Sequence, residues 1–137
     1  MRSGRCYCGA VVLTIHSEAE TVTYCHCTDC RRLTGAPVAA FAAFPSGTVE
    51  VAPDPGSVSA NPGVRRRFCK ACGSALTAEF DYLPGQIYVP IGVLNDADDL
   101  APRMHAHAKQ CLPWLHISDD LPRAHGSARA DLNADRS

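Results

Sequence analysis

Eight cysteines in a chain of 137 residues constrain this sequence more than any other feature. Seven of them fall into three short groups, which we call the N-terminal pair (Cys6, Cys8), the triplet (Cys25, Cys27, Cys30) and the distal pair (Cys69, Cys72). Residues 1–5 lead directly into the first cysteine without the apolar stretch of a secretory signal peptide. We therefore expect a reducing, cytoplasmic setting, where clustered cysteines serve as metal ligands more often than as disulfides.

Each pair offers half of a tetrahedral zinc site, provided that the backbone curls between its two side chains. In an extended strand residues i and i+2 lie about 7 Å apart, whereas zinc holds each sulfur at about 2.3 Å. Gly9 and Gly73 directly follow the two pairs, and glycine tolerates the positive φ that such a curl needs. Two pairs together would complete one closed four-cysteine site.

Spacing alone leaves the combination of these groups open. The N-terminal pair can share an ion with the distal pair, about sixty residues away, or with Cys25 and Cys27. Counting favours the first arrangement, because two pairs then close one site and the triplet stays together. Three ligands with an open fourth position are typical of catalytic zinc. The alternative is a second structural zinc that His26, Asp29 or a distant histidine completes.

The charge of a three-thiolate site narrows its chemistry. Zinc with three thiolates carries a net charge of about −1 and is a poorer Lewis acid than a three-histidine centre. Its natural fourth partner is therefore a soft ligand, such as the thiolate of a substrate. Arg31 and Arg32 follow the triplet and would offset its charge or bind a substrate carboxylate. The triplet is the predicted reactive centre, with these arginines as candidate substrate-binding residues.

Short β-type runs separated by turn signals predict a mainly β, single-domain protein with antiparallel pairing. The clearest runs cover residues 11–15, 38–44, 48–51, 76–80 and 87–94. No segment shows a sustained helical period, so at most one or two helical turns are expected after Cys30. The domain is predicted over residues 1–122, followed by a polar, flexible C-terminal tail at 123–137.

Charge and composition exclude several classes of function. The net charge of −1 gives no global attraction to nucleic acid or to an acidic membrane, and no apolar run is long enough to span a bilayer. The sequence has no Ser/His/Asp set, phosphate-binding loop or dinucleotide fingerprint. The basic run at residues 65–67 has two interpretations, a grip for phosphate or carboxylate and a solvated strand edge that offsets the metal-site charge.

Five further residues receive individual expectations. His26 stands between two cysteines, so its side chain is expected to point away from the metal. His105 and His107 have the spacing of one strand face, which two histidines could use to bind a metal; because no third ligand is evident, we interpret this face as solvated. Trp114 is expected to anchor the core, and Cys111 to contribute packing.

The cysteine groups belong to longer motifs, and the chain adds a fourth near its end. These are Gly4-Arg5-Cys6-Tyr7-Cys8-Gly9-Ala10-Val11, Cys25-His26-Cys27-Thr28-Asp29-Cys30-Arg31-Arg32-Leu33-Thr34-Gly35, Phe68-Cys69-Lys70-Ala71-Cys72-Gly73-Ser74, and Pro113-Trp114 with Asp119-Asp120-Leu121-Pro122. In this order they resemble the glutathione-dependent formaldehyde-activating (GFA) family, which also includes centromere protein V. The resemblance spans about residues 4–122. Asp120 stands where the family more often has glycine. This difference bears on the identity of the substrate and not on the metal ligands.

The resemblance implies a fold of several small, coiled antiparallel sheets and two Zn²⁺ per chain. Cys6, Cys8, Cys69 and Cys72 look like the family's structural zinc ligands, and Cys25, Cys27 and Cys30 like its catalytic ones. The implied activity is that of a carbon–sulfur lyase, which joins glutathione to formaldehyde as S-hydroxymethylglutathione. The expected partners are therefore a small-molecule thiol and a small aldehyde, with no membrane and no nucleic acid.

Two other functions stay open at this point. A non-catalytic zinc module for a protein or nucleic-acid partner is the first, and thiol redox or zinc sensing by the triplet is the second. The sequence does not fix the oligomeric state, and a homo-oligomer is one of the open alternatives.

Overall fold

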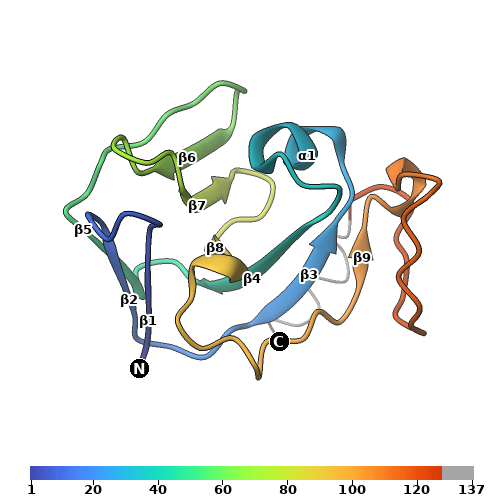
Figure 1. The fold of residues 1–137 in the computed structure, drawn as a ribbon, viewed down its shortest axis with the longest axis horizontal. Helices are drawn as coiled ribbons and strands as arrows, with labels where there is room; N and C mark the ends of the chain where they lie inside the picture. Colours follow the sequence, from blue (N-terminus) through green and yellow to red (C-terminus); the bar gives the residue numbers. More distant parts are fainter. Residues whose placement is uncertain (128–137) are drawn as a thin grey trace.

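The computed structural model describes residues 1–127, which form two β-sheets and one short α-helix. The smaller sheet has the order β1-β2-β5, with β1 at Arg2–Arg5, β2 at Val12–Ile15 and β5 at Val49–Ala52. It lies on the left in Figure 1, beside the N-terminus. Among the described residues, no helix has both the length and the hydrophobicity that a membrane crossing requires.

The larger sheet has six strands in the order β6-β7-β8-β4-β3-β9. Their bounds are Val64–Phe68 (β6), Ala75–Phe80 (β7), Gln86–Pro90 (β8), Ala39–Pro45 (β4), Thr21–Cys25 (β3) and His105–Ala106 (β9). The pairs are antiparallel except β3 with β9, which run parallel. The helix α1 (Thr28–Thr34) follows β3, and two 3-10 turns occupy Ile91–Val93 (η1) and Ala108–Gln110 (η2).

The prediction of a mainly β, largely antiparallel domain is confirmed. The five expected runs correspond to β2, β4, β5, β7 and β8, although the last run ends as a strand at Pro90 and continues as η1. The helical segment begins at Thr28, so Cys30 lies inside α1 rather than before it. Strands β1 and β6 escaped prediction because their sequences, RSGR and VRRRF, lack apolar alternation, and β3 was also missed.

Strands β4 and β8 bury both of their faces, and this divides the interior in two. Ala42 and Phe44 of β4 pack with Ile87 of β8 in a cluster that also contains Leu13 and the rest of the inter-sheet core. Successive side chains of a strand point to opposite faces. The alternate residues of β4 and β8 therefore belong to a second cluster, which contains Cys25 and Cys30 of the triplet.

Two of the individual predictions fail where the chain leaves the sheets. Trp114 is 63% exposed, so it does not anchor the core; no strand or helix covers the turn that carries it. His105 is buried at 2% exposure, so it does not belong to a solvated strand face. Cys111 is half-buried in the same segment.

The residues after 122 continue alongside β9 as far as the structure describes them. The His105 N–H donates to the Pro122 carbonyl at 2.8 Å, and the Ala124 N–H donates back to the His105 carbonyl at 2.9 Å. The predicted tail at 123–137 otherwise lies outside the described residues.

Gly4 provides a test of the packing between β1 and the segment after η1. A Cβ at this position would lie 2.5 Å from the Val93 carbonyl oxygen and 3.3 Å from the Leu94 Cα, both of which are backbone atoms. We expect Gly4→Ala to lower the free energy of unfolding by about 1–3 kcal/mol, because the clash must move backbone. Denaturant unfolding measures the loss. Gly92→Ala is the matched control, since its Cβ would meet no atom within 4 Å.

Candidate functional site

The N-terminal pair and the distal pair form one cluster of four sulfurs. All four Sγ atoms lie within 4.8 Å of one another, with 3.6 Å between Cys6 and Cys8 and 3.8 Å between Cys8 and Cys69. Ligands at about 2.3 Å from a tetrahedral zinc are separated by about 3.8 Å, so this four-cysteine cluster has the spacing of a metal site. The first of the two combinations that spacing had left open is the one that the fold brings together.

Two loops of similar form present these sulfurs. Gly9 and Gly73 have φ of 82° and 81°, as the curl around each pair requires, and the Gly73 N–H donates to the Cys69 carbonyl at 2.7 Å. The Ser74 hydroxyl oxygen accepts from the Tyr7 N–H at 2.9 Å, which links one loop to the other. Ser74 also hydrogen-bonds Cys72, and this bond is the main cause that lowers the pKa of the Cys72 thiol to about 5.

The triplet stands where β3 ends and α1 begins. Cys25 is the last residue of β3, Cys27 is the N-cap of α1 and Cys30 lies in its first turn. The Cys27 sulfur accepts from the Cys30 N–H at 3.2 Å, and the Cys25 and Cys27 sulfurs are 3.5 Å apart. Within residues 1–127 no histidine or carboxylate joins these three sulfurs, so His26 and Asp29 do not complete a fourth position.

The three thiols of the triplet cannot ionise together without a counter-charge. Hydrogen bonds with Cys25 and Cys30 lower the pKa of the Cys27 thiol to about 2. The same contact with Cys27 raises the pKa of Cys25 to about 11, and contacts with Cys25 and Cys27 together with burial raise the pKa of Cys30. One thiolate is therefore favoured and the other two sulfurs stay protonated. Only a cation among them would stabilise all three as thiolates, and sulfur donors suit a soft or borderline one.

The cysteines of both clusters are free thiols. The sulfurs lie 3.5–3.8 Å apart in the pairs Cys6–Cys8, Cys8–Cys69 and Cys25–Cys27, against about 2.05 Å for an S–S bond. The two clusters can hold metal ions, and the chemistry of their donors is that of zinc sites.

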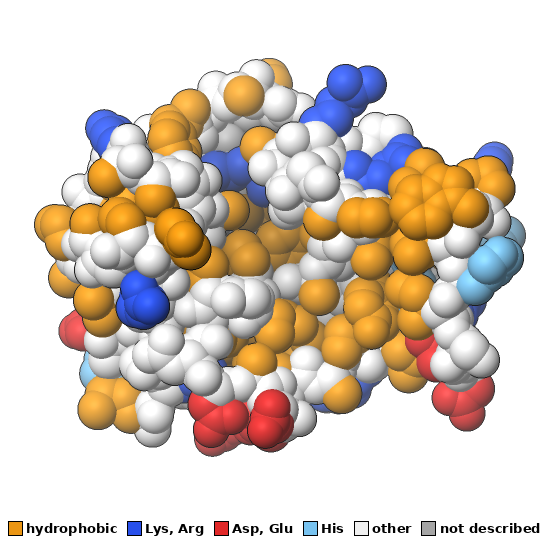
Figure 2. Space-filling view, in the orientation of Figure 1, with side chains coloured by type: hydrophobic (Ala, Val, Ile, Leu, Met, Phe, Trp, Pro, Cys, Tyr) orange, Lys and Arg blue, Asp and Glu red, His pale blue; other side chains and the backbone are white. Residues whose placement is uncertain are grey.

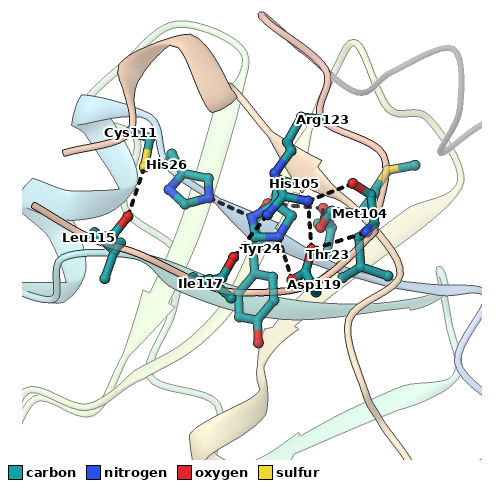
Figure 3. Close-up of polar contacts among 11 residues, drawn as sticks. Thr23, Tyr24, His26, Met104, His105, Cys111, Leu115, Ile117, Asp119 and Arg123 are labelled. Carbon is teal, nitrogen blue, oxygen red and sulfur yellow. Dashed lines mark hydrogen bonds and ion pairs between the residues drawn. The ribbon is translucent and has the colours of Figure 1, made fainter. Parts of the chain in front are cut away.

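His26 points away from the triplet, as its place between two cysteines predicted. Its Nε2 lies 2.8 Å from His105 Nδ1, and His105 Nε2 lies 2.9 Å from an oxygen of Asp119 (Figure 3). A carboxylate only accepts hydrogen bonds, so His105 donates at Nε2. Arg123 donates to the other oxygen of Asp119. His105, which the sequence had placed on a solvated face, is thus the middle of a polar chain behind the triplet that runs from the buried His26 to Asp119 at the surface.

The charges along this chain are settled by its contacts. The hydrogen bond from His105, aided by Arg123, holds the pKa of Asp119 down at about 2, against an ordinary 3.8. Burial lowers the pKa of His26, so its ring is neutral at neutral pH. A carboxylate therefore terminates a chain of imidazoles whose far end holds the loop that carries Cys25 and Cys27.

A cavity of about 490 Å³ opens beside the triplet, and all three of its cysteines line it. Figure 2 shows the hollow on this face, where hydrophobic side chains gather. Phe41, Leu83 and Tyr88 are buried residues of its wall. The other apolar residues that line it are Leu33, Val58, Ala60, Val64, Phe68, Phe80 and Ala106.

The two candidate substrate-binding arginines point to different places. Arg32 lines the cavity, whereas Arg31 does not, and the buried Arg31 Nε has no hydrogen-bond partner among the described residues. They are neighbours on a helix of seven residues, so a rotation of about 100° separates their side chains. Of the three histidines that the sequence singled out, His26, His105 and His107, only His107 lines the cavity.

Two more polar residues belong to this wall: Tyr82, which sequence reasoning missed, and Arg66, which it considered only as one member of the basic run at 65–67. Burial raises the pKa of the Tyr82 hydroxyl, and negative charge on the triplet raises it further, so Tyr82 keeps its proton at neutral pH. Alternation along β6 would have separated Arg66 from Arg65 and Arg67, had this strand been recognised. No signal in the sequence pointed to Tyr82.

Comparisons with known proteins agree with this geometry. The family model of the glutathione-dependent formaldehyde-activating enzyme matches residues 1–110. The fold is similar to the crystal structure of a Rhodobacter sphaeroides protein solved in structural genomics, with a TM-score of 0.57 and 18% sequence identity over 89% of this chain and 99% of that chain. No curated protein matched the sequence.

The polar chain of His26, His105 and Asp119 behind the triplet leads to a prediction about how stability depends on pH. Because the pKa of Asp119 is depressed in the folded protein, its contribution to stability is present above its ordinary pKa and is lost as pH falls toward 2. We expect Asp119→Asn to lower the thermal midpoint at pH 7, and the difference from wild type to shrink below about pH 4. Thermal unfolding across pH measures both.

The matched control is Asp120→Asn, since Asp120 is exposed and adjacent. Equal thermal midpoints for the two variants at pH 7 would contradict a stabilising role for Asp119.

Proposed function

Because the chain belongs to the glutathione-dependent formaldehyde-activating enzyme family, we propose that it is a zinc-dependent carbon–sulfur lyase of the S-(hydroxymethyl)glutathione synthase type. It would add a thiol such as glutathione to a small aldehyde. The observation that carries this proposal is a set of three converging cysteine sulfurs in the wall of a cavity, without a fourth ligand among the described residues.

The two cysteine clusters would have different roles. Cys6, Cys8, Cys69 and Cys72 would hold a structural zinc, since four sulfurs fill the coordination of the ion. The triplet would hold the catalytic zinc, which would supply the positive charge that keeps a substrate thiol ionised near neutral pH. Two Zn²⁺ per chain are therefore expected.

The side chains around the triplet would bind and orient the two reactants. Arg32, exposed at the edge of the cavity, suits a carboxylate of the thiol substrate. Arg31 does not line the cavity, so we assign it no contact with the substrate. The apolar wall around Phe41 and Tyr88 would exclude water, which strengthens electrostatic contacts inside.

The reaction needs no oxidant or reductant. The substrate sulfur attacks the carbonyl carbon, a C–S bond forms, the C=O π bond opens, and a proton reaches the oxygen. Holding both reactants in one cavity replaces an encounter of two solutes. Tyr82 retains its proton, so its hydroxyl can donate a hydrogen bond to the oxygen as negative charge develops there.

The proposed setting is a reducing compartment such as the cytoplasm. The cysteines of both clusters are free thiols, and clustered free thiols persist best where oxidation is kept low.

Metal content is the first test of the two-site assignment. We expect two zinc ions per chain in wild type and one in Cys27→Ser, measured by elemental analysis. Serine is itself a preferred N-cap, so this variant keeps an oxygen acceptor at the start of α1 while it removes one thiolate. Cys111→Ser is the control and should keep both ions, because Cys111 belongs to neither cluster. A Cys27→Ser protein with two tightly held ions would contradict the assignment.

Turnover tests the chemistry itself. Zinc-loaded wild type should accelerate the addition of glutathione to formaldehyde above the uncatalysed rate. Cys27→Ser should lower kcat/KM by at least ~100-fold, because loss of one ligand removes the charge that activates the thiol. Cys111→Ser should react like wild type. A wild-type rate equal to the uncatalysed rate, for several thiols and aldehydes, would overturn the proposed function.

A further inference from the structure

The cavity beside the triplet has a polar rim and an aromatic interior. Asp29, Arg32 and Gln110 line it and are exposed, whereas Phe41 and Tyr88 are at most 7% exposed. Such a division gives two kinds of binding surface within reach of the same three sulfurs. The rim suits a hydrophilic, charged molecule, and the interior suits a flat apolar one.

The rings of the interior are arranged around Phe80. Its ring meets Tyr88 edge-on with 5.5 Å between centroids, and meets Tyr82 at a tilt with 5.6 Å between centroids. These are favourable geometries for aromatic pairs, and all three rings line the cavity, so they offer apolar and π surface to a further ring.

One positive charge faces this aromatic interior, and strand register fixes which one. Arg66 of β6 lies directly opposite Ala78 of β7, and Ala78 lies opposite Tyr88 of β8. Directly opposed residues of neighbouring strands point to the same face. Arg66 therefore shares the cavity face with Tyr88, and its guanidinium lies 5.4 Å from the centroid of the Phe80 ring.

The neighbouring arginines point the other way and are neutralised there. Arg65 pairs with Asp81 at 2.8 Å and approaches Glu79 at 3.8 Å. Arg67 lies 3.5 Å from Asp54 and 3.6 Å from Glu79. For Arg66, no carboxylate within residues 1–127 comes within ion-pair distance. The interpretation as a charge-paired strand edge thus applies to Arg65 and Arg67. The interpretation as a grip for an anion applies to Arg66, which has no carboxylate partner among residues 1–127.

We propose that the interior is the subsite for the carbonyl substrate, and that this substrate is an aromatic aldehyde with a carboxylate on its ring. The proposal rests on the thiol–aldehyde function above. The ring would lie against Phe80 and Tyr88, with the carboxylate on Arg66 and the aldehyde carbon toward the triplet. Formaldehyde would leave this surface unused, since it has neither a ring nor a charge.

The thiol belongs to the rim for a chemical reason. Glutathione carries two carboxylates, an ammonium group and two amides, and these groups lose hydrogen bonds to water when apolar walls enclose them. The exposed Arg32 and Asp29 can bind such charges while water still reaches them. In the resulting addition a C–S bond forms to the benzylic carbon, the C=O π bond opens, and the thiol proton ends on the oxygen.

The decisive experiment measures binding without reaction. The probe is 4-carboxybenzyl alcohol, which has the ring and the carboxylate of the proposed substrate but an alcohol in place of the aldehyde, and benzyl alcohol is its uncharged match. Calorimetric titration of the zinc-loaded full chain should show that the acid binds more tightly. Arg66→Gln should weaken binding of the acid about tenfold to a hundredfold and leave benzyl alcohol unchanged. Arg65→Gln is the control and should change neither affinity.

Kinetics separate this inference from the function on which it rests. With glutathione as thiol, kcat/KM for 4-carboxybenzaldehyde should exceed that for formaldehyde and should fall in Arg66→Gln, while the value for benzaldehyde stays constant. Turnover of formaldehyde without Arg66-dependent binding of the acid would overturn the aromatic subsite and keep the lyase. Arg66-dependent binding without any addition of thiol would keep the subsite and overturn the lyase. Unchanged benzyl alcohol binding shows that Arg66→Gln is folded.

Discussion

Repulsion between clustered thiolates is the constraint on which the rest of this structure depends. Each cluster gathers three or four sulfurs within 4.8 Å, and ionised sulfurs at that distance repel one another unless a cation lies among them. The four-cysteine cluster joins the loop after β1 to the loop after β6, so it connects the small sheet to the edge of the large one. The triplet joins β3 to α1 in the same way. A cation in each cluster would therefore both relieve the repulsion between the sulfurs and hold together the elements that carry them.

The alternation of side chains along the strands gives the large sheet one face toward the inter-sheet core and one face toward the cavity. In β4, Ala42 and Phe44 pack between the sheets, while Phe41 faces the triplet, so one strand supplies both the core and the cavity wall. The same rule acts in β6, where it points Arg66 into the cavity and Arg65 toward acidic partners. The part of the cavity wall that β4 and β8 form is the reverse side of the inter-sheet core, so close packing supports it from behind.

The sequence predicted what its local chemistry determines. Cysteine spacing identified the three groups of sulfurs, and Gly9 and Gly73 indicated the curl at the two pairs, but spacing left open which groups combine until the fold brought the two pairs together. It could not predict His105, whose partner Asp119 lies fourteen residues further on in a segment without any period. Trp114 failed for the same reason, since residue type alone says nothing of whether a loop is covered. The choice of Arg32 over Arg31 needed the rotation of α1, and the choice of Arg66 needed the register of β6.

The segment Cys25-His26-Cys27 combines two sulfurs that line the cavity with a histidine that holds the loop from the other side. Cys25 ends β3 with its sulfur toward the cavity, and His26 points to the opposite side. The histidine ring is therefore free to bond His105, whose own partner Asp119 stays ionised under the influence of Arg123. A chain of hydrogen bonds then fixes the backbone from behind without adding a ligand in front. This arrangement explains why the triplet consists of three sulfurs without an imidazole, although a histidine stands between two of its members: the imidazole holds the loop from behind, and the sulfurs line the cavity.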